Sequence, residues 1–194
     1  MQNNLTTEDG AYAINGYTGD DGRTIQRTPG AKWFLPSEDE WYKAAYYKGG
    51  GTNAGYWDYP TSSDTAPGQD MADASGNNAN YYTAPYVLPI ASGKYTTVAG
   101  EFQNSDSPYG TFDQGGNVWE WNETIPYTFY RGIRGGSFYR NYLHASVRGS
   151  DLPSGEGYSY FYGFRVAEAV PEPSSVFAMM GGVLFLLTLA KRKR

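Results

Sequence analysis

The apolar residues of this chain are concentrated at its C-terminus. Residues 174–190 contain no charged side chain, and Lys191-Arg192-Lys193-Arg194 follow them directly. At about 1.5 Å per residue, a helix over 174–190 is roughly 25 Å long, which is at the short end of what crosses a bilayer. Because basic residues stay on the cytoplasmic side of a membrane, the pattern predicts a transmembrane helix at 174–190 and a basic cytoplasmic end at 191–194. The alternative, a helix buried in a core, does not account for the four terminal charges.

A second, amphipathic helix is predicted to begin after Ser37. The Ser37 hydroxyl can cap this helix while Glu40, three residues later, reaches back to complete a capping box. The apolar positions of Trp41–Ala45 follow at helical spacing and should pack inward, and Gly49-Gly50-Gly51 ends the pattern. Acidic residues suit the first turn of a helix, so capping explains them without a metal-binding or catalytic role.

The remaining pattern is irregular and predicts loops with a few short strands. Residues 1–30 and 52–111 are rich in Gly, Asn, Ser, Asp and Pro. A loop region of this length needs an organising element, for which bound calcium and dense aromatic packing are the alternatives. Short strands joined by glycine turns are predicted at 115–121, 134–138 and 163–167, with further strand candidates at Tyr86–Ile90 and Tyr95–Val98.

Composition narrows the function classes. Aromatic residues make up 17% of the chain, including 19 Tyr, and there is no Cys, which excludes disulfides, thiolate metal sites and Cys nucleophiles. The net charge is −5, and the basic residues at 191–194 leave the rest of the chain more acidic still. Such a balance argues against nucleic-acid binding, which needs a basic surface, and is compatible with divalent cations.

The segment before the hydrophobic tail carries the first resemblance. Pro171-Glu172-Pro173, an apolar helix and a basic end occur in that order, which resembles the bacterial PEP-CTERM sorting signal. The resemblance implies recognition by an exosortase, cleavage near these prolines, inner-membrane anchoring before sorting, and export to the surface or beyond in a Gram-negative bacterium. Met1–Asp9 has no signal-peptide pattern, so we expect an N-terminal part to be missing.

Four further motifs carry a second resemblance, to the formylglycine-generating enzyme family, also called sulfatase-modifying factors. These motifs are Phe34–Ala45, Gly116–Trp121, Arg134–Phe138 and Gly163–Val166. The resemblance implies an irregular, loop-rich α+β fold related to C-type lectins over residues 1–167, truncated at its N-terminus. Residues 168–173 then form a linker that ends in the Pro-Glu-Pro motif.

The family's metal chemistry is expected to carry over only in part. Its enzymes oxidise a substrate cysteine with copper held by two cysteines, and a related branch uses iron held by histidines. Because this chain has no Cys and a single His, His144, we expect no copper, and we interpret His144 as a surface or packing residue. Enzymatic chemistry is therefore not expected, although Ser137 matches an active-site serine of the family, without an evident base.

A calcium ion is the cofactor that the resemblance favours. In the family, a carboxylate or amide, two backbone carbonyls and the motif glutamate bind Ca²⁺. The matching positions are Asp113, Gly116, Val118 and Glu120. The alternative is that Glu120 pairs with an arginine such as Arg134 or Arg165. A second family site uses an Asn that Asn80 resembles, without a visible acidic partner.

The resemblance places a concave face around the Gly-Gly-Ser segment. Side chains there and near 160 are Tyr, Arg and Asn, which supply large amphipathic contact area at low entropy cost. We expect ligand contacts from Tyr139, Arg140, Asn141, Tyr142, Tyr160 and Tyr162. Trp119 and Trp121 are either a sugar platform or core residues, and family packing favours the core. Arg134, Arg148 and Arg165 are expected to brace loops.

Three functional hypotheses follow. The first is a non-catalytic surface or extracellular-matrix module that binds exopolysaccharide or a peptide and not nucleic acid. The second is an oxidoreductase-like enzyme with altered chemistry. The third is a partial gene product without a stable fold.

Overall fold

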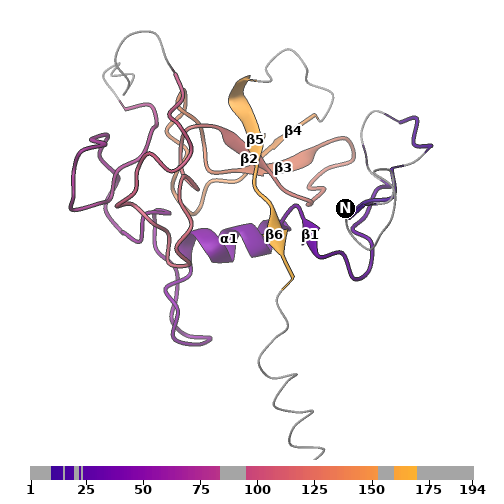
Figure 1. Cartoon of the computed structure of the whole chain (residues 1–194), viewed down its shortest axis with the longest axis horizontal. Helices are drawn as coiled ribbons and strands as arrows, with labels where there is room; N and C mark the ends of the chain where they lie inside the picture. The colour runs from indigo at the N-terminus through magenta and orange to yellow at the C-terminus, as the bar shows by residue number, and fades with distance from the viewer. Residues whose placement is uncertain are drawn as a thin grey trace, which may run out of the picture.

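The part of the chain that the structure describes has one short helix and two small sheets, joined by long loops (Figure 1). The computed structural model describes residues 10–14, 16–19, 22, 24–83, 95–152 and 160–169. Within these residues the predicted loop-rich, irregular α+β architecture is confirmed. The predicted C-terminal helix, the Pro-Glu-Pro motif and the strand candidate Tyr86–Ile90 lie outside them. None of the described helices is long and apolar enough to cross a membrane.

The strands form two separate sheets. In the two-stranded sheet, β1 pairs antiparallel with β6, and in the four-stranded sheet the order is β4-β3-β2-β5. β2 runs antiparallel to β3 and parallel to β5. The bounds of the elements are β1 Trp33–Phe34, α1 Glu38–Tyr46, β2 Trp119–Trp121, β3 Arg131–Arg134, β4 Gly149–Asp151, β5 Tyr162–Phe164 and β6 Ala167–Glu168.

Helix α1 begins as its sequence predicts. The Ser37 hydroxyl accepts a hydrogen bond from the Glu40 amide at 3.2 Å, and the Glu40 carboxylate accepts one from the Ser37 amide at 2.7 Å. Its end was predicted wrongly, because the helix stops at Tyr46 and not at the glycines. Tertiary contacts end it there: the Tyr46 carbonyl accepts from the Trp57 amide at 2.7 Å, and the buried Tyr46 hydroxyl donates to the Leu143 carbonyl at 2.9 Å.

The core consists of small clusters around aromatic residues. The largest buried side chains include Trp41 and Tyr46, whose rings lie edge to face at 6.0 Å. Dispersed packing of this kind suits a chain with few regular elements, because each loop is fixed by its own aromatic contacts. The three clusters are Trp41, Ala45, Tyr46 and Ala145; Ala11, Ala31 and Phe34; and Ala79, Tyr81 and Leu143.

Side-chain amides replace sheet pairing in the loops. The strand predicted at Tyr95–Val98 does not form. The Asn117 side chain instead accepts from the Thr97 amide at 3.0 Å and donates to the Thr97 carbonyl at 3.3 Å. One amide side chain thus takes the place of a neighbouring strand, which a strand propensity cannot reveal.

The four-stranded sheet has two chemically different faces, because successive side chains of a strand point to opposite sides. Glu120 of β2 and Arg134 of β3 face helix α1, where they contact Trp41 and Glu38. The opposite face carries aromatic side chains, and the register places Trp119 beside Tyr162 and Trp121 beside Phe164. This aromatic face is free of the helix.

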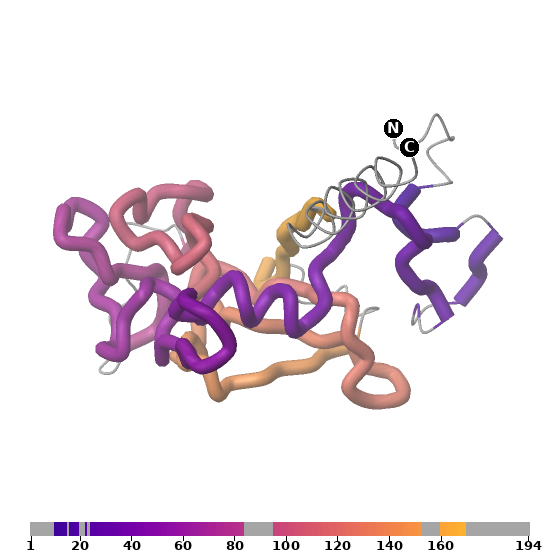
Figure 2. Tube along the Cα trace, turned by 90° about the horizontal axis from the view of Figure 1, so that it is seen from below, coloured from indigo at the N-terminus to yellow at the C-terminus, as the bar shows by residue number. Residues whose placement is uncertain are grey.

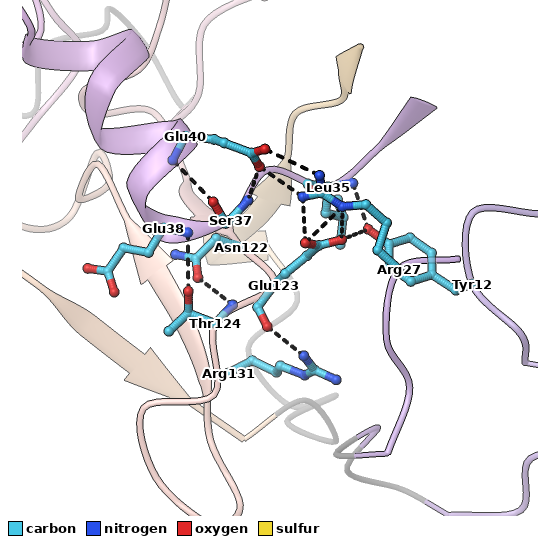
Figure 3. A network of polar contacts seen from close by, with 10 residues as sticks. All are labelled: Tyr12, Arg27, Leu35, Ser37, Glu38, Glu40, Asn122, Glu123, Thr124 and Arg131. Atoms are coloured by element: carbon cyan, nitrogen blue, oxygen red, sulfur yellow. Dashed lines mark hydrogen bonds and ion pairs between the residues drawn. The ribbon is translucent and has the colours of Figure 1, made fainter. Parts of the chain in front are cut away.

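A carboxylate ties the N-terminal segment to the rest of the molecule (Figure 3). Glu123 accepts hydrogen bonds from the Tyr12 hydroxyl at 2.6 Å and from Arg27 Nη2 at 2.6 Å. Arg27 Nη2 also donates to Glu40 at 2.8 Å, which links this segment to the start of helix α1. In Figure 2 the described N-terminal residues lie at one end of the molecule and the loops 50–83 and 95–111 at the other, with the sheet between them.

Candidate functional site

The helix-facing side of the sheet is held by two ion pairs, and the first, which is buried, joins α1 to β3. Glu38 and Arg134 each expose 6% of their side chains, and Arg134 Nη2 lies 2.6 Å from Glu38 Oε1. Arg134 Nη1 also donates to the carbonyls of Ala145 and Val147, at 3.0 and 2.6 Å. Arg148, which is largely exposed, donates to the same carboxylate oxygen at 2.6 Å. The predicted bracing role of these arginines is confirmed.

The second pair engages the glutamate that was expected to bind calcium. Arg165 Nε and Nη2 donate to the two oxygens of Glu120, both at 2.5 Å, and Trp41 Nε1 donates to Oε2 at 2.6 Å. Of the two alternatives for Glu120, the ion pair with Arg165 is therefore present. Glu120 Oε1 accepts only the bond from Arg165 Nη2 among the described residues. Because a carboxylate oxygen has two acceptor positions, the pair leaves one that a cation could use.

The loop before β2 has other features that fit a cation. Asp113 has a φ of 54° and accepts from the Gly100 amide at 2.5 Å. Gly116 has a φ of 81°, and a Cβ there would lie 2.2 Å from the Asn80 carbonyl oxygen, so only glycine fits. Asn80 Oδ1 is buried without a hydrogen-bond partner, and buried acceptors are normally satisfied. No cluster of three or more His, Cys, Asp or Glu side chains occurs within the described residues.

The aromatic face of the sheet opens into a cavity of about 1240 Å³, which we name the aromatic cleft. It contains Ser137 and four of the six residues expected to contact a ligand, namely Tyr139, Arg140, Tyr160 and Tyr162. Asn141 and Tyr142 are not in its lining, and Tyr142 instead packs against Trp119 with ring centroids 5.8 Å apart. The full lining is Tyr95, Thr96, Trp119, Ser137, Phe138, Tyr139, Arg140, Asp151, Tyr160, Phe161 and Tyr162.

Three aromatic residues that the sequence did not single out complete the cleft. Phe138 lies between Tyr95 and Phe161, with near-parallel rings at centroid distances of 5.3 and 5.4 Å. Tyr160 packs on Phe161 at 4.2 Å and remains 59% exposed. Buried rings thus support exposed ones, an arrangement that presents rigid amphipathic surface to solvent.

The two tryptophans of β2 have intermediate roles. Trp119 is buried, as a core residue should be, yet it also lines the cleft. Trp121 is half-buried and its ring lies 5.1 Å from that of Tyr162. Neither alternative stated from the sequence is complete, because one residue can both pack and line a cavity.

The charged groups of the cleft are engaged within it. The Arg140 guanidinium lies over the Tyr139 ring, 5.0 Å from its centroid. The Asp151 carboxylate accepts from the Leu152 amide at 2.7 Å and from the Tyr162 hydroxyl. Burial and the neighbouring Asp151 carboxylate raise the pKa of Tyr162, so this phenol stays protonated and keeps its donor at neutral pH.

Ser137 does not have the environment of a nucleophile. Its side chain is 1% exposed, and its hydroxyl accepts from the Tyr139 amide at 3.3 Å. Activation of a serine requires a base within hydrogen-bond reach, and no described residue supplies one. His144, the single histidine, is elsewhere on the surface, where Nδ1 contacts Ser146 Oγ at 2.8 Å and Nε2 lies 3.5 Å from Asp58.

Comparison with known proteins identifies the domain. Residues 10–170 match the family described as "Sulfatase-modifying factor enzyme 1-like domain". No curated protein matches the chain. Solved structures with a similar fold include "Crystal Structure of CarF", at 22% identity and a TM-score of 0.46, and "Treponema denticola variable protein 1", at 20% and 0.42.

These two structures are larger than this chain. The matches cover 76% and 74% of this chain but 52% and 50% of theirs, so the chain spans about half the length of the solved structures it matches. At these identities and TM-scores, neither likeness supports a statement about function.

Proposed function

The chain belongs to the sulfatase-modifying factor family, and on this basis we propose that it is an exported, non-catalytic surface or extracellular-matrix module that binds a ligand in the aromatic cleft. The ligand is an exopolysaccharide or a peptide. The observation that carries this proposal is the cleft itself, a cavity of about 1240 Å³ lined by seven aromatic side chains. Concave, mostly aromatic sites with a few polar groups are typical of ligand binding.

The absence of cysteine supports a binding role. Without Cys the chain has no copper site of the kind that the family's oxidases use. Soft Cu(I) requires thiolate or thioether ligands, and the cleft contains hydroxyl, phenol, guanidinium and carboxylate groups. An oxidoreductase with altered chemistry is the alternative, and oxygen consumption with a Cys-containing peptide and added copper would support it over the binding module.

The C-terminal sequence supports export. Pro171-Glu172-Pro173, the apolar run 174–190 and the basic end match the order of a PEP-CTERM signal. In this proposal the tail anchors the protein in the inner membrane until an exosortase cleaves it. Expression with and without an exosortase gene tests this step: the enzyme should convert a membrane-bound species into a shorter surface or secreted one, and Glu172→Ala should prevent the conversion.

A structural calcium ion in the loop before β2 is a separate part of the proposal. Asp113, the carbonyls of Gly116 and Val118, and the remaining acceptor position of Glu120 would hold it, since Ca²⁺ prefers hard oxygen ligands. Melting temperature should rise with Ca²⁺ and fall with a chelator, by mass action on the native state. Asp113→Gly tolerates the positive φ of this position while removing the carboxylate, so it should abolish the response. An unchanged melting temperature would remove calcium from the proposal and leave the cleft unaffected.

The binding function is tested with the exported domain, residues 1–169, on glycan and peptide arrays. A cooperative thermal transition of this protein must be observed first, because it excludes the hypothesis of a partial product without a stable fold. Tyr160→Ser removes an exposed ring of the cleft and should lower binding. Tyr109→Ser is the matched control, because Tyr109 is 52% exposed and does not line the aromatic cleft. A protein that folds but binds neither array would refute the proposed function.

A further inference from the structure

A second cavity lies at the end of β2, where Trp121 is part of its wall. It has a volume of about 650 Å³ and is walled by apolar side chains of the N-terminal segment and of the β2–β3 connection, among them Ile14, Ile25, Leu35, Trp121 and Ile125. We name it the N-terminal cavity. Leu35 and Trp121 belong to family motifs, but none of the six ligand contacts expected from the sequence lines this cavity.

The charged groups at the edge of the N-terminal cavity are already satisfied. Arg27 donates to the carboxylates of Glu123 and Glu40, as Figure 3 shows. Arg131 donates to the Glu123 carbonyl at 2.7 Å and to the Gly22 carbonyl. Because these guanidinium groups have partners within the protein, the cavity offers apolar walls rather than a free charge.

Aromatic rings of β2 and β5 connect the two cavities. Tyr162 lines the aromatic cleft and Trp121 lines the N-terminal cavity, and their ring centroids are 5.1 Å apart. Alternation places Trp119, Trp121, Tyr162 and Phe164 on one face, and the parallel register sets Trp121 beside Phe164. Phe164 is 67% exposed. We call these four residues the aromatic strip.

We propose that one extended ligand, a neutral polysaccharide chain, lies along the aromatic strip and fills both cavities. This inference rests on the proposed function and deepens it by choosing between its two ligand classes. Rings on alternate residues of a strand repeat at about 6.6 Å. Because Trp119 is buried, the stacking positions of the strip are the rings of Trp121, Tyr162 and Phe164. A polysaccharide is itself a repeating chain, and each sugar ring has an apolar C–H face and a rim of hydroxyl groups.

The polar groups favour a sugar over a peptide. Tyrosine combines an apolar ring with a hydroxyl that can meet a sugar hydroxyl, and Tyr139, Tyr160 and Tyr162 all line the cleft. One mode of recognising extended peptides adds a strand to an unpaired sheet edge, whereas the strip lies on the face of the sheet. Asp151 accepts hydrogen bonds from the Leu152 amide and the Tyr162 hydroxyl, and Arg140 lies over the Tyr139 ring, so a neutral chain breaks no ion pair of these two groups on binding.

The experiment is a length series. Neutral oligosaccharides from disaccharide to octasaccharide, taken from the polysaccharides that bind on the array, are titrated calorimetrically into the exported domain. We expect affinity to rise with length until both cavities are filled. Phe164→Ser should lower the affinity for the octasaccharide by about twofold to tenfold, the value of one aromatic contact, and leave the affinity for the disaccharide unchanged. Tyr160→Ser should lower the affinity for both oligosaccharides, and Tyr109→Ser should change neither affinity.

Other results distinguish the inference from the function it rests on. If Phe164→Ser leaves octasaccharide affinity unchanged while Tyr160→Ser lowers it, the ligand ends within the aromatic cleft, and the inference is wrong while the proposed function stands. Binding of peptides only, sensitive to Tyr160→Ser, has the same consequence. Absence of binding to both arrays by the folded domain overturns both.

Discussion

The buried pair between Glu38 and Arg134 provides the sharpest test of how the sheet is held. Replacing Glu38 by Gln keeps the shape of the side chain but leaves the Arg134 guanidinium buried without a counterion. Each side chain is 6% exposed, so water cannot replace the lost partner. Breaking a buried pair from one side costs about 3–5 kcal/mol, against a total stability of about 5–15 kcal/mol for an ordinary domain. The melting temperature should fall by about 6–20 °C.

Three variants make this prediction specific. Urea denaturation followed by tryptophan fluorescence gives the free energy of unfolding of each. Arg148→Ala removes the exposed partner of the same carboxylate and should cost about 0–1 kcal/mol. The double variant Glu38→Leu with Arg134→Met removes both charges but leaves the Ala145 and Val147 carbonyls without this donor, so it should recover only part of the loss. A loss below about 1 kcal/mol for Glu38→Gln, or a double variant no more stable than the single one, would refute the reasoning.

Two further predictions concern single residues. Hydrogen bonds from Arg27 lower the pKa of Glu40 in the folded protein, so the ionised carboxylate stabilises the fold above about pH 4.3 and that stability is lost as the pH falls. Glu40→Gln keeps the capping box but removes this titration, so its free energy of unfolding should depend less on pH in acid than that of the unmodified protein. An identical acid denaturation curve would contradict this. Gly116→Ala should lower the free energy of unfolding, measured by chemical denaturation, more than Gly110→Ala does. Both glycines have positive φ, but a Cβ clashes with the Asn80 carbonyl only at 116, so the Gly110 variant should lose only the backbone term of about 1–2 kcal/mol. Equal losses would show that the close approach at Gly116 is unimportant.

Local signals in the sequence predicted the start of helix α1 and strand β2, but not β3, which covers Arg131–Arg134 where a strand over 134–138 was expected. The capping box of Ser37 and Glu40 is complete within four residues, so it needs no knowledge of the fold. The motif around Trp119 and Trp121 likewise marked a strand after a glycine turn, because the turn and the alternation are adjacent in the chain. These features depend on residues adjacent in the sequence, so they can be predicted without a structure.

Features that depend on distant partners were missed. The end of helix α1 is set by the Trp57 amide, and the loop at Thr97 by the Asn117 side chain. Neither partner is adjacent in the chain, so no periodicity records the contact. The docking of the N-terminal segment through Glu123 is another example, since Tyr12 is 111 residues away from that carboxylate.

The sequence predicted which types of residue form the candidate site but not how they are arranged. The tyrosines and Arg140 were expected on a concave face, and four of the six expected residues line the cleft. Phe138 escaped notice because a buried ring that supports a site has the same sequence signal as a core ring. Tyr95 and Phe161 were missed because only the fold brings their rings against Phe138. The aromatic strip was hidden for a different reason: its order depends on the register between β2 and β5, which only the structure fixes.

The two faces of the sheet have a consequence for how such a protein can change. Along β2, the residue that holds the scaffold, Glu120, stands between Trp119 and Trp121, and along β5 Gly163 separates Tyr162 from Phe164. The exposed rings Tyr160 and Phe164 make no contact with the two ion pairs, so a library of substitutions there can alter selectivity while Glu38, Arg134, Glu120 and Arg165 keep the framework. Along each strand, residues that can be substituted alternate with residues that must be kept. This small domain is therefore a suitable starting point for directed evolution of new binding specificities.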